Sequence, residues 1–135
     1  VKKWTRVLEL LMRVQEEEAE MEDEKRGKIE GWIAAYLKEN PISSGDRWYE
    51  GIHTDSPLVH GGYFWLRPSH LHEHMTFRRV RREPNELHRD LKQYGFRSAV
   101  AAAREAQGGR VQARYWRIPL DDVARVLQTH ELERA

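Results

Sequence analysis

The fold of this chain is decided by residues 84–119, PNELHRDLKQYGFRSAVAAAREAQGGRVQARYWRIP. Pro84 stands at an early helical position, and Gly95 can take the left-handed conformation that ends many helices. The residues between these two signals therefore predict a helix over 84–94. The apolar side chains that predict its buried face are Leu87, Leu91 and Tyr94.

Two extended segments follow this helix, Phe96–Arg104 and Arg110–Leu120, on either side of EAQGG. Adjacent glycines permit the positive backbone angles that a hairpin turn requires. We therefore predict a β-hairpin. The three alanines at 101–103 favour a helix by intrinsic propensity, so a helix is the competing interpretation of the first segment.

Upstream of this region, the pattern alternates between strand, helix and loop signals. Residues 61–68, GGYFWLRP, hold four consecutive strand formers between glycine and proline, which predicts a short strand. Ser69 can cap a short helix through 70–77, and the basic run RRVRR at 78–82 leads to the next helix. Residues 41–61 are rich in Pro, Ser, Gly and Asp and predict a loop with room for a short strand.

Two further helical patterns precede this loop. Apolar residues between positions 2 and 15 fall at helical spacing, and the acidic run EEEAEMEDE follows at 16–24. Gly27 permits a break before a second helix. The core stripe of that second helix is Ile29, Trp32, Ile33, Tyr36 and Leu37. We assign residues 1–27 to an amphipathic and acidic helical appendage, and residues 28–130 to the main domain.

The predicted order is helix, short strand, helix-turn-helix, hairpin and terminal helix, the last carrying Val123, Val126 and Leu127. This order is typical of an α+β fold of the winged-helix type, preceded here by the amino-terminal amphipathic helix. In a winged helix, the second helix of the helix-turn-helix enters a nucleic-acid groove and the hairpin forms the wing. The helix at 84–94 would then be the recognition helix.

The net charge of +1 hides an asymmetry between the two halves of the chain. Residues 1–60 carry nine Lys and Arg against thirteen Asp and Glu, or −4, whereas residues 61–135 carry fourteen against nine, or +5. Lys92 is the only lysine of the basic half. Because the planar fork of arginine suits phosphates and base edges, this distribution predicts binding to nucleic acid, and we expect that nucleic acid to be DNA. Salt bridging to the acidic half is the alternative.

The candidate binding residues lie on the predicted recognition helix and around it. With the apolar residues turned inward, Asn85, Arg89, Lys92 and Gln93 lie largely outward, and His88 is at the border. This mixture of phosphate-seeking and base-reading side chains predicts a major-groove helix, although an ordinary solvated face has the same pattern. The residues predicted to hold phosphates are Arg78, Arg79, Arg81, Arg82, Arg110 and Arg114.

The histidines at 70–74 raise the question of a metal. His70 and His74 stand one helical turn apart, which is a zinc-ligand spacing, but the HExxH order is not matched and no third ligand is fixed by spacing. We therefore predict neither a metal nor a cofactor. A metal enzyme that adds His53 or His60 is the lesser alternative. Nucleotide-binding, nucleophile-elbow and cysteine motifs are also missing, so we expect a non-enzymatic protein.

The compartment and the solubility follow from what the sequence lacks. The chain has no cysteine, which permits a reducing compartment. No apolar run approaches the ~20 residues that a membrane-spanning helix needs. We expect a soluble, cytoplasmic protein without a membrane partner.

Residues 77–96, FRRVRREPNELHRDLKQYGF, and 108–123, GGRVQARYWRIPLDDV, resemble the carboxyl-terminal winged-helix region of phage- and plasmid-type primase-helicases. The matching residues are Leu91, Lys92, Gly95, Phe96, Gly109, Arg110, Tyr115, Trp116, Ile118 and Pro119. The resemblance implies an accessory domain of a DNA replication protein. Walker motifs and primase carboxylates are missing, so this would be a detached domain. Many transcription regulators share the same order of elements.

A protein-interaction module is the alternative function. Several winged helices bind proteins, and the amphipathic helix predicted near the amino terminus carries Trp4, Leu8, Leu11 and Met12 on one side. An exposed apolar surface of this kind usually marks a site where another protein binds. The helix would then pair with a partner protein or with a second copy of the chain as a homodimer.

Overall fold

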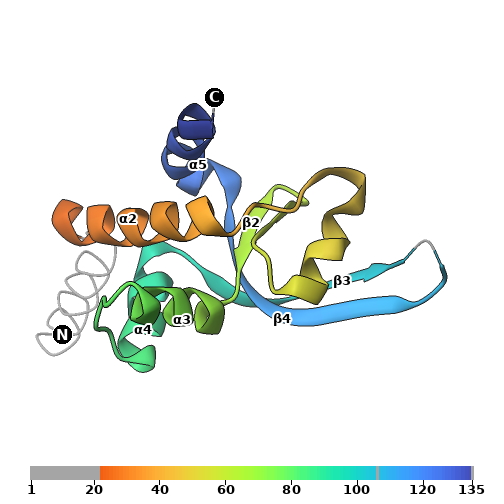
Figure 1. Ribbon diagram of the computed structural model, residues 1–135, viewed down its shortest axis with the longest axis horizontal. Helices are drawn as coiled ribbons and strands as arrows, with labels where there is room; N and C mark the ends of the chain where they lie inside the picture. Colours follow the sequence, from red (N-terminus) through yellow and green to blue (C-terminus); the bar gives the residue numbers. More distant parts are fainter. Residues whose placement is uncertain (1–21, 106, 135) are drawn as a thin grey trace, which may run out of the picture.

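The structure is a computed structural model that describes residues 22–105 and 107–134. It contains, in chain order (Figure 1), α2 (Asp23–Glu39), the 3-10 helix η1 (Gly45–Thr54), β1 (Leu58–His60), β2 (Tyr63–Leu66), α3 (Pro68–Phe77), α4 (Pro84–Tyr94), β3 (Arg97–Arg104), β4 (Arg110–Pro119) and α5 (Leu120–Arg134). The predicted α+β class is confirmed. The helix predicted over residues 2–15, with most of the appendage 1–27, lies outside the described residues, and so does its predicted partner surface.

The four strands form one antiparallel sheet in the order β1-β2-β4-β3. β4 lies between two neighbours of different length. The short β2 reaches only the carboxyl-terminal part of β4. β3 pairs with β4 along its whole length, from Arg97 opposite Arg117 to Arg104 opposite Arg110. Figure 1 shows the outer part of the β3–β4 hairpin extending away from the group of helices. The hairpin therefore projects from the body of the domain.

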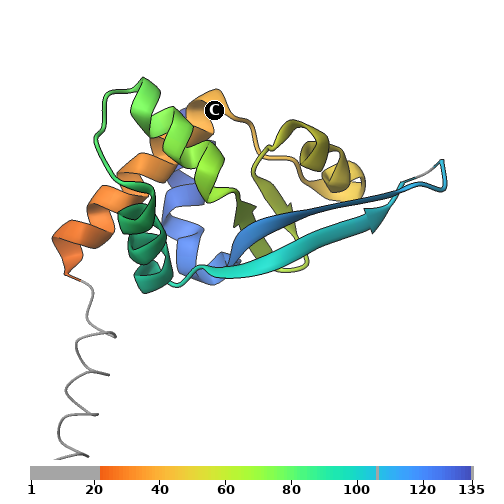
Figure 2. The ribbon, with the colours of Figure 1, turned by 90° about the horizontal axis from the view of Figure 1, so that it is seen from below.

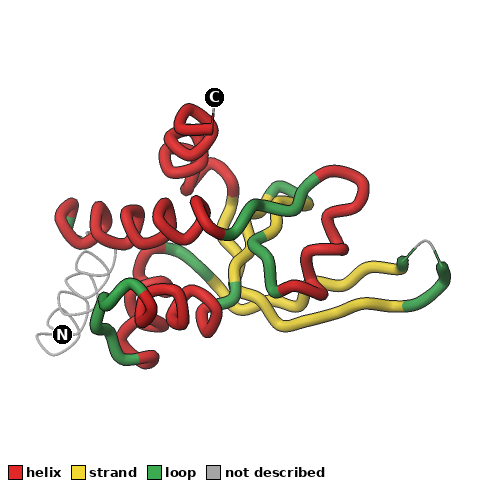
Figure 3. Tube along the Cα trace, viewed as in Figure 1, coloured by secondary structure: helices red, strands yellow, loops and turns green. Residues whose placement is uncertain are grey.

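One core lies between the helices and one face of the sheet. Apolar residues of α2, α3, α4 and α5 pack with Phe64, Leu66 and Ile118 of the strands. Phe96, which follows Gly95, is fully buried and meets the ring of Phe64 edge-on, with ring centroids 6.3 Å apart. In Figure 3 the yellow strands continue from this helical group toward the hairpin tip. The helices thus cover the base of the sheet.

A second core lies on the opposite face of the sheet, under η1. Side chains alternate between the faces of a strand, so Phe64 enters the helical core while its neighbour Trp65 enters the second one. The buried residues of this second core are Trp48, Ile52, Leu58, Trp65, Ala101, Val111 and Tyr115. The inner face of the hairpin is therefore covered along much of its length.

The alanines of β3 lie in a strand, which confirms the predicted hairpin. Ala99, Ala101 and Ala103 all belong to the cluster under η1, which fits their alternation along the strand. Their small side chains let η1 lie close to the hairpin. Pairing with β4 along the whole of β3 outweighs the helical propensity of alanine, which amounts to less than about 1 kcal/mol per residue.

The predicted break at Gly27 is wrong, because α2 runs without interruption from Asp23 to Glu39. A glycine within a helix costs about 1 kcal/mol relative to alanine. Gly27 is exposed and lies among good helix formers, and the helix is held by the buried Ile29, Ile33 and Leu37 further along. Packing of the later turns therefore outweighs the cost of this glycine.

Two further local predictions need correction. The segment 41–61, predicted as a loop with room for a short strand, does contain a short strand, β1, but it also contains the helix η1, because Trp48 and Ile52 are buried against the sheet. The predicted cap at Ser69 is also wrong, since α3 begins at Pro68 and has no side-chain cap. A capping side chain stands immediately before the helix, and here that position is Arg67, whereas Ser69 is the second residue of the helix.

Candidate nucleic-acid interface

The outward stripe of α4 contains the residues that the sequence predicts. Leu87, Leu91 and Tyr94 are buried, as predicted, and α4 begins and ends at the predicted residues, Pro84 and Tyr94. Gln93, four residues after Arg89, is exposed but bonded to Lys25 of α2. The other exposed residues at three- and four-residue spacing are Asn85, His88, Arg89 and Lys92. Because residues at this spacing share one face of a helix, these four side chains form one stripe.

The outer face of the β3–β4 hairpin carries several arginines. Since the alanines facing η1 occupy one side, the alternate residues lie on the other side. Those alternate residues, all exposed, are Ser98, Val100, Ala102 and Arg104 of β3 with Arg110, Gln112 and Arg114 of β4. Arg104 pairs with Arg110 across the strands, and Arg114 pairs with Val100. Three guanidinium groups therefore share this face.

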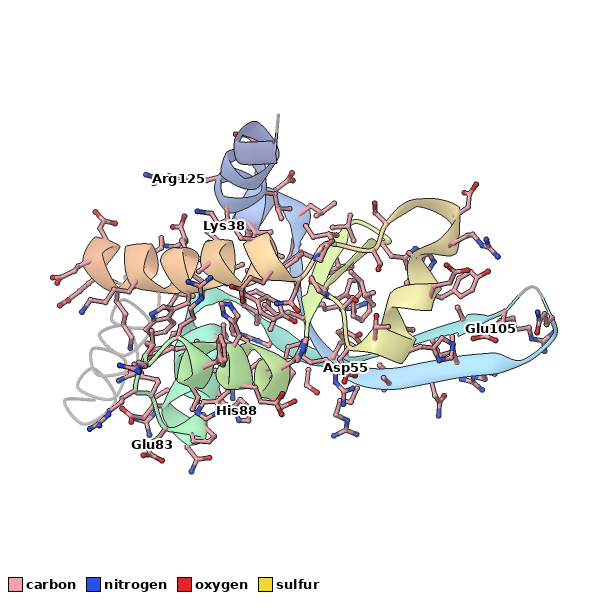
Figure 4. All side chains as sticks on the ribbon, viewed as in Figure 1. Lys38, Asp55, Glu83, His88, Glu105 and Arg125 are labelled. Atoms are coloured by element: carbon pink, nitrogen blue, oxygen red, sulfur yellow. The ribbon has the colours of Figure 1, made fainter. Side chains whose placement is uncertain are left out.

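A ring contact joins α4 to the outer face of the hairpin. The imidazole of His88 stacks on the indole of Trp116, with centroids 5.1 Å apart and planes inclined by 24°. Trp116 lies two residues from Arg114 in β4 and therefore on the same side of the strand. Figure 4 shows His88 on the side of α4 away from α2. We call the combined set, Asn85, His88, Arg89, Lys92, Trp116, Arg114, Arg110 and Arg104, the α4–hairpin surface.

The cations of the α4–hairpin surface make no ion pair with the described residues. Within residues 22–105 and 107–134, no ion pair joins Arg89, Lys92, Arg110 or Arg114 to a carboxylate. Glu105, at the end of β3, is hydrogen-bonded to His53 of η1. Figure 4 shows Glu105 near the far end of the hairpin. The surface therefore presents positive charge to solvent.

Arg82, one of the predicted phosphate ligands, is paired with a buried carboxylate of α4. Its Nε donates to Oδ2 of Asp90 at 2.9 Å, and its Nη2 lies 2.8 Å from the same oxygen. Its Nη1 donates to the carboxylate of Glu86 at 2.8 Å. Asp90 is only 1% exposed. Its Oδ1 receives no directed hydrogen bond, and the ammonium of Lys25 reaches it as an ion pair at 3.1 Å.

Asp90 is the residue that the sequence reading missed. It stands three residues after Leu87 and four before Tyr94, within the buried stripe of α4. A carboxylate at such a position signals a buried ion pair, because a buried charge needs partners. Lys25 also donates to the side chain of Gln93 at 2.7 Å, so Gln93 lies on the flank of α4 that faces α2. Gln93 therefore lies at the edge of α4 and is not part of the α4–hairpin surface, although the sequence predicted it as a binding residue.

The basic run at 78–82 is paired at its two ends, Arg78 and Arg82. Arg78 pairs with Glu39, whereas Arg79 and Arg81 are exposed and make no ion pair within the described part of the chain. Desolvation raises the pKa of Glu39, but the hydrogen bond and charge of Arg78, together with His74, lower it below its usual value. Arg79 has a φ of 62°, a conformation that costs a non-glycine residue about 1–3 kcal/mol.

The histidines considered for a metal site each have a protein partner. His70 Nδ1 lies 2.6 Å from the hydroxyl of Tyr36, and His74 Nε2 lies 2.9 Å from Glu39. His72 Nε2 lies 2.7 Å from the carbonyl of Arg82. Among residues whose placement is described, no group of three or more His, Asp or Glu side chains could hold a metal ion.

The chain matches no protein-family model, and neither the curated proteins nor the solved structures that were compared with it gave a match. Within the described ranges, every helix is too short or too polar to cross a membrane.

Proposed function

We propose that this chain is a non-enzymatic winged-helix module that binds duplex DNA, with α4 as the recognition helix and the β3–β4 hairpin as the wing. The observation that carries the proposal is the α4–hairpin surface, in which unpaired cations of two elements are joined through His88 and Trp116. The order of elements supports it, because a short strand precedes α3 and α4 and the returning strand β4 lies between β2 and β3.

Each part of the surface has a role in this proposal. An α-helix fits the major groove, where Asn85 and Arg89 have the donor groups that read base edges. Lys92 contributes a further positive charge on the same stripe. The hairpin arginines, Arg104, Arg110 and Arg114, are suited to phosphates beside the groove, where they fix the register of the protein on the duplex. Arg82 is paired with Asp90 and holds α4 in position, so we do not include it among the residues that contact DNA.

The resemblance to primase-helicase accessory regions supports a role in DNA replication, in which this module holds DNA for a separate catalytic domain. A transcription regulator would use the same surface. The two differ in sequence preference, because a regulator discriminates strongly between sites whereas phosphate contacts alone carry no sequence information.

Replacing Arg89 or Arg114 with alanine is expected to weaken duplex binding, and Arg114→Ala, which removes a phosphate contact, should also lower the salt dependence of the association constant. Each lost phosphate contact reduces the slope of log K against log salt by about 0.9. The matched control is Arg47→Ala, which removes the same charge from η1, where Arg47 is exposed and paired with Glu50 at 3.0 Å. Fluorescence anisotropy over a salt series measures both quantities.

This experiment has two outcomes that count against the proposal. Wild-type protein that does not bind duplex DNA at low salt would contradict nucleic-acid binding. Equal weakening by Arg47→Ala and by Arg114→Ala would show that overall charge, and not the α4–hairpin surface, sets the affinity.

A further inference from the structure

The turn between α3 and α4 presents an aromatic side chain to solvent. Phe77, the last residue of α3, is 82% exposed, the highest value among the large apolar residues that are described as exposed. It is followed by the exposed Arg79 and Arg81, neither of which is paired in the described part of the chain. We call Phe77, Arg79 and Arg81 the turn cluster.

The backbone of this turn is fixed on both sides. The N–H of Arg79 donates to the carbonyl of Thr76 at 3.0 Å, and the N–H of Val80 donates to the carbonyl of Met75 at 2.8 Å. These two bonds form a Schellman motif, in which the residue with positive φ is usually glycine. Here it is Arg79, with φ at 62°. The side chain of Val80 packs against the helical core.

Side chains hold the turn at both ends as well. Arg78 is paired with Glu39 of α2, and Arg82 is paired with the buried Asp90 of α4. His72 of α3 contacts the carbonyl of Arg82 at 2.7 Å. The paired arginines therefore anchor the loop, while Arg79 and Arg81 between them and Phe77 beside them are exposed. A turn fixed in this way holds the exposed Phe77 next to the anchored Arg78 and so presents a defined shape to a ligand.

The chemistry of the turn cluster fits one unpaired nucleotide. A base stacks on an aromatic ring irrespective of its sequence, and adjacent cations hold the phosphates. A fully paired duplex offers no free base face to Phe77. An arginine at a backbone position that suits glycine also indicates that its side chain matters more than the local strain.

We propose that the turn cluster binds an unpaired nucleotide, so that the preferred ligand is duplex DNA with a single-stranded extension. This inference rests on the proposed function, since the α4–hairpin surface would hold the duplex. In Figure 2, α4 lies between the α3–α4 turn and the base of the hairpin. The eleven residues of α4 span about 16 Å, or roughly five nucleotides of a duplex strand at ~3.4 Å each.

The test compares three ligands, a blunt duplex, the same duplex with a single-stranded extension and an oligothymidylate, against wild type, Phe77→Ala, Phe77→Tyr and Arg79→Gly. We expect Phe77→Ala to weaken binding of the extended duplex by about tenfold, as loss of one stacked base does, and to leave the blunt duplex unchanged. Phe77→Tyr keeps the ring and should keep the affinity.

Arg79→Gly separates binding from folding. Glycine relieves the positive φ, so the variant should melt at a higher temperature than wild type while it binds the extended duplex more weakly and with a salt slope lower by about one. If Arg79→Gly is more stable than wild type and binds more weakly, misfolding cannot explain the lower affinity.

The outcomes distinguish this inference from the function on which it rests. Absence of binding to every ligand by wild type overturns the proposed function. Duplex binding that depends on Arg89 and Arg114, with equal affinity for the blunt and extended duplexes and no effect of Phe77→Ala, overturns only the turn cluster as a nucleotide site. Loss of binding to anionic lipid vesicles or to a protein partner in Phe77→Ala, with DNA binding unchanged, overturns it in favour of another ligand.

Discussion

Replacing Ala101 with glutamate is expected to destabilise the domain by at least about 3 kcal/mol, because a charged side chain would enter an apolar cluster without a partner. Ala101 is 1% exposed and belongs to the core formed by Trp48, Ile52 and Tyr115 under η1. The added carbons also exceed the space that alanine occupies. Urea unfolding monitored by tryptophan fluorescence measures the loss.

The neighbouring residue supplies the control. Ala102 lies opposite Gln112 on the exposed face of the hairpin, so Ala102→Glu should change the free energy of unfolding by less than about 0.5 kcal/mol. The new carboxylate would stand among Arg104, Arg110 and Arg114 and should weaken duplex binding. Ala101→Glu should therefore reduce stability, whereas Ala102→Glu, its neighbour in the same strand, should reduce DNA binding alone. Equal stability of the two variants would contradict the assigned faces of β3.

Replacing Asp90 with alanine is the second change with a large expected effect, a loss of about 3 kcal/mol in the free energy of unfolding. The carboxylate is buried, whereas its partners Arg82 and Lys25 are 31% and 37% exposed. Removal of Asp90 leaves two partly buried cations that repel each other. A carboxylate removed from the surface would cost much less, typically under about 1 kcal/mol.

Glu86→Ala is the matched control, since Glu86 also pairs with Arg82 at 2.8 Å but is 44% exposed. A double-mutant cycle between Asp90→Ala and Arg82→Ala gives the coupling of the buried pair, which we expect at about 1–3 kcal/mol. Equal losses for Asp90→Ala and Glu86→Ala, or additive effects in the cycle, would show that the buried ion pair does not hold α4 in position.

The elements that the sequence predicts best are those whose ends are encoded locally. Pro84 and Gly95 mark the limits of α4, and the adjacent glycines before Arg110 mark the hairpin. η1 has no comparable signal, because its turns are ordered by Trp48 and Ile52 against a sheet whose strands come later in the chain. The continuity of α2 through Gly27 likewise depends on packing further along the helix.

Some residues of the candidate site can likewise be identified from local spacing, and others only from the fold. Helical spacing alone identifies Asn85, Arg89 and Lys92 as one stripe. Spacing does not tell which arginines of the run 78–82 are available to a ligand, because the partners of Arg78 and Arg82 are Glu39 and Asp90, which lie on two other elements. The stacking of His88 on Trp116 also joins elements that are separate in sequence.

The covered inner face of the hairpin has a consequence for the entropy of binding. A two-stranded ribbon alone is marginally stable in water. Here η1 backs the ribbon with an apolar core that includes Ala101, Val111 and Tyr115, and the hydroxyl of Tyr115 donates to the carbonyl of Ser56 at 3.0 Å. The backbone that carries the outer arginines is thus already ordered in the free protein. A ligand that binds this face orders the arginine side chains but not the backbone, so the entropy cost of ordering a loop is avoided.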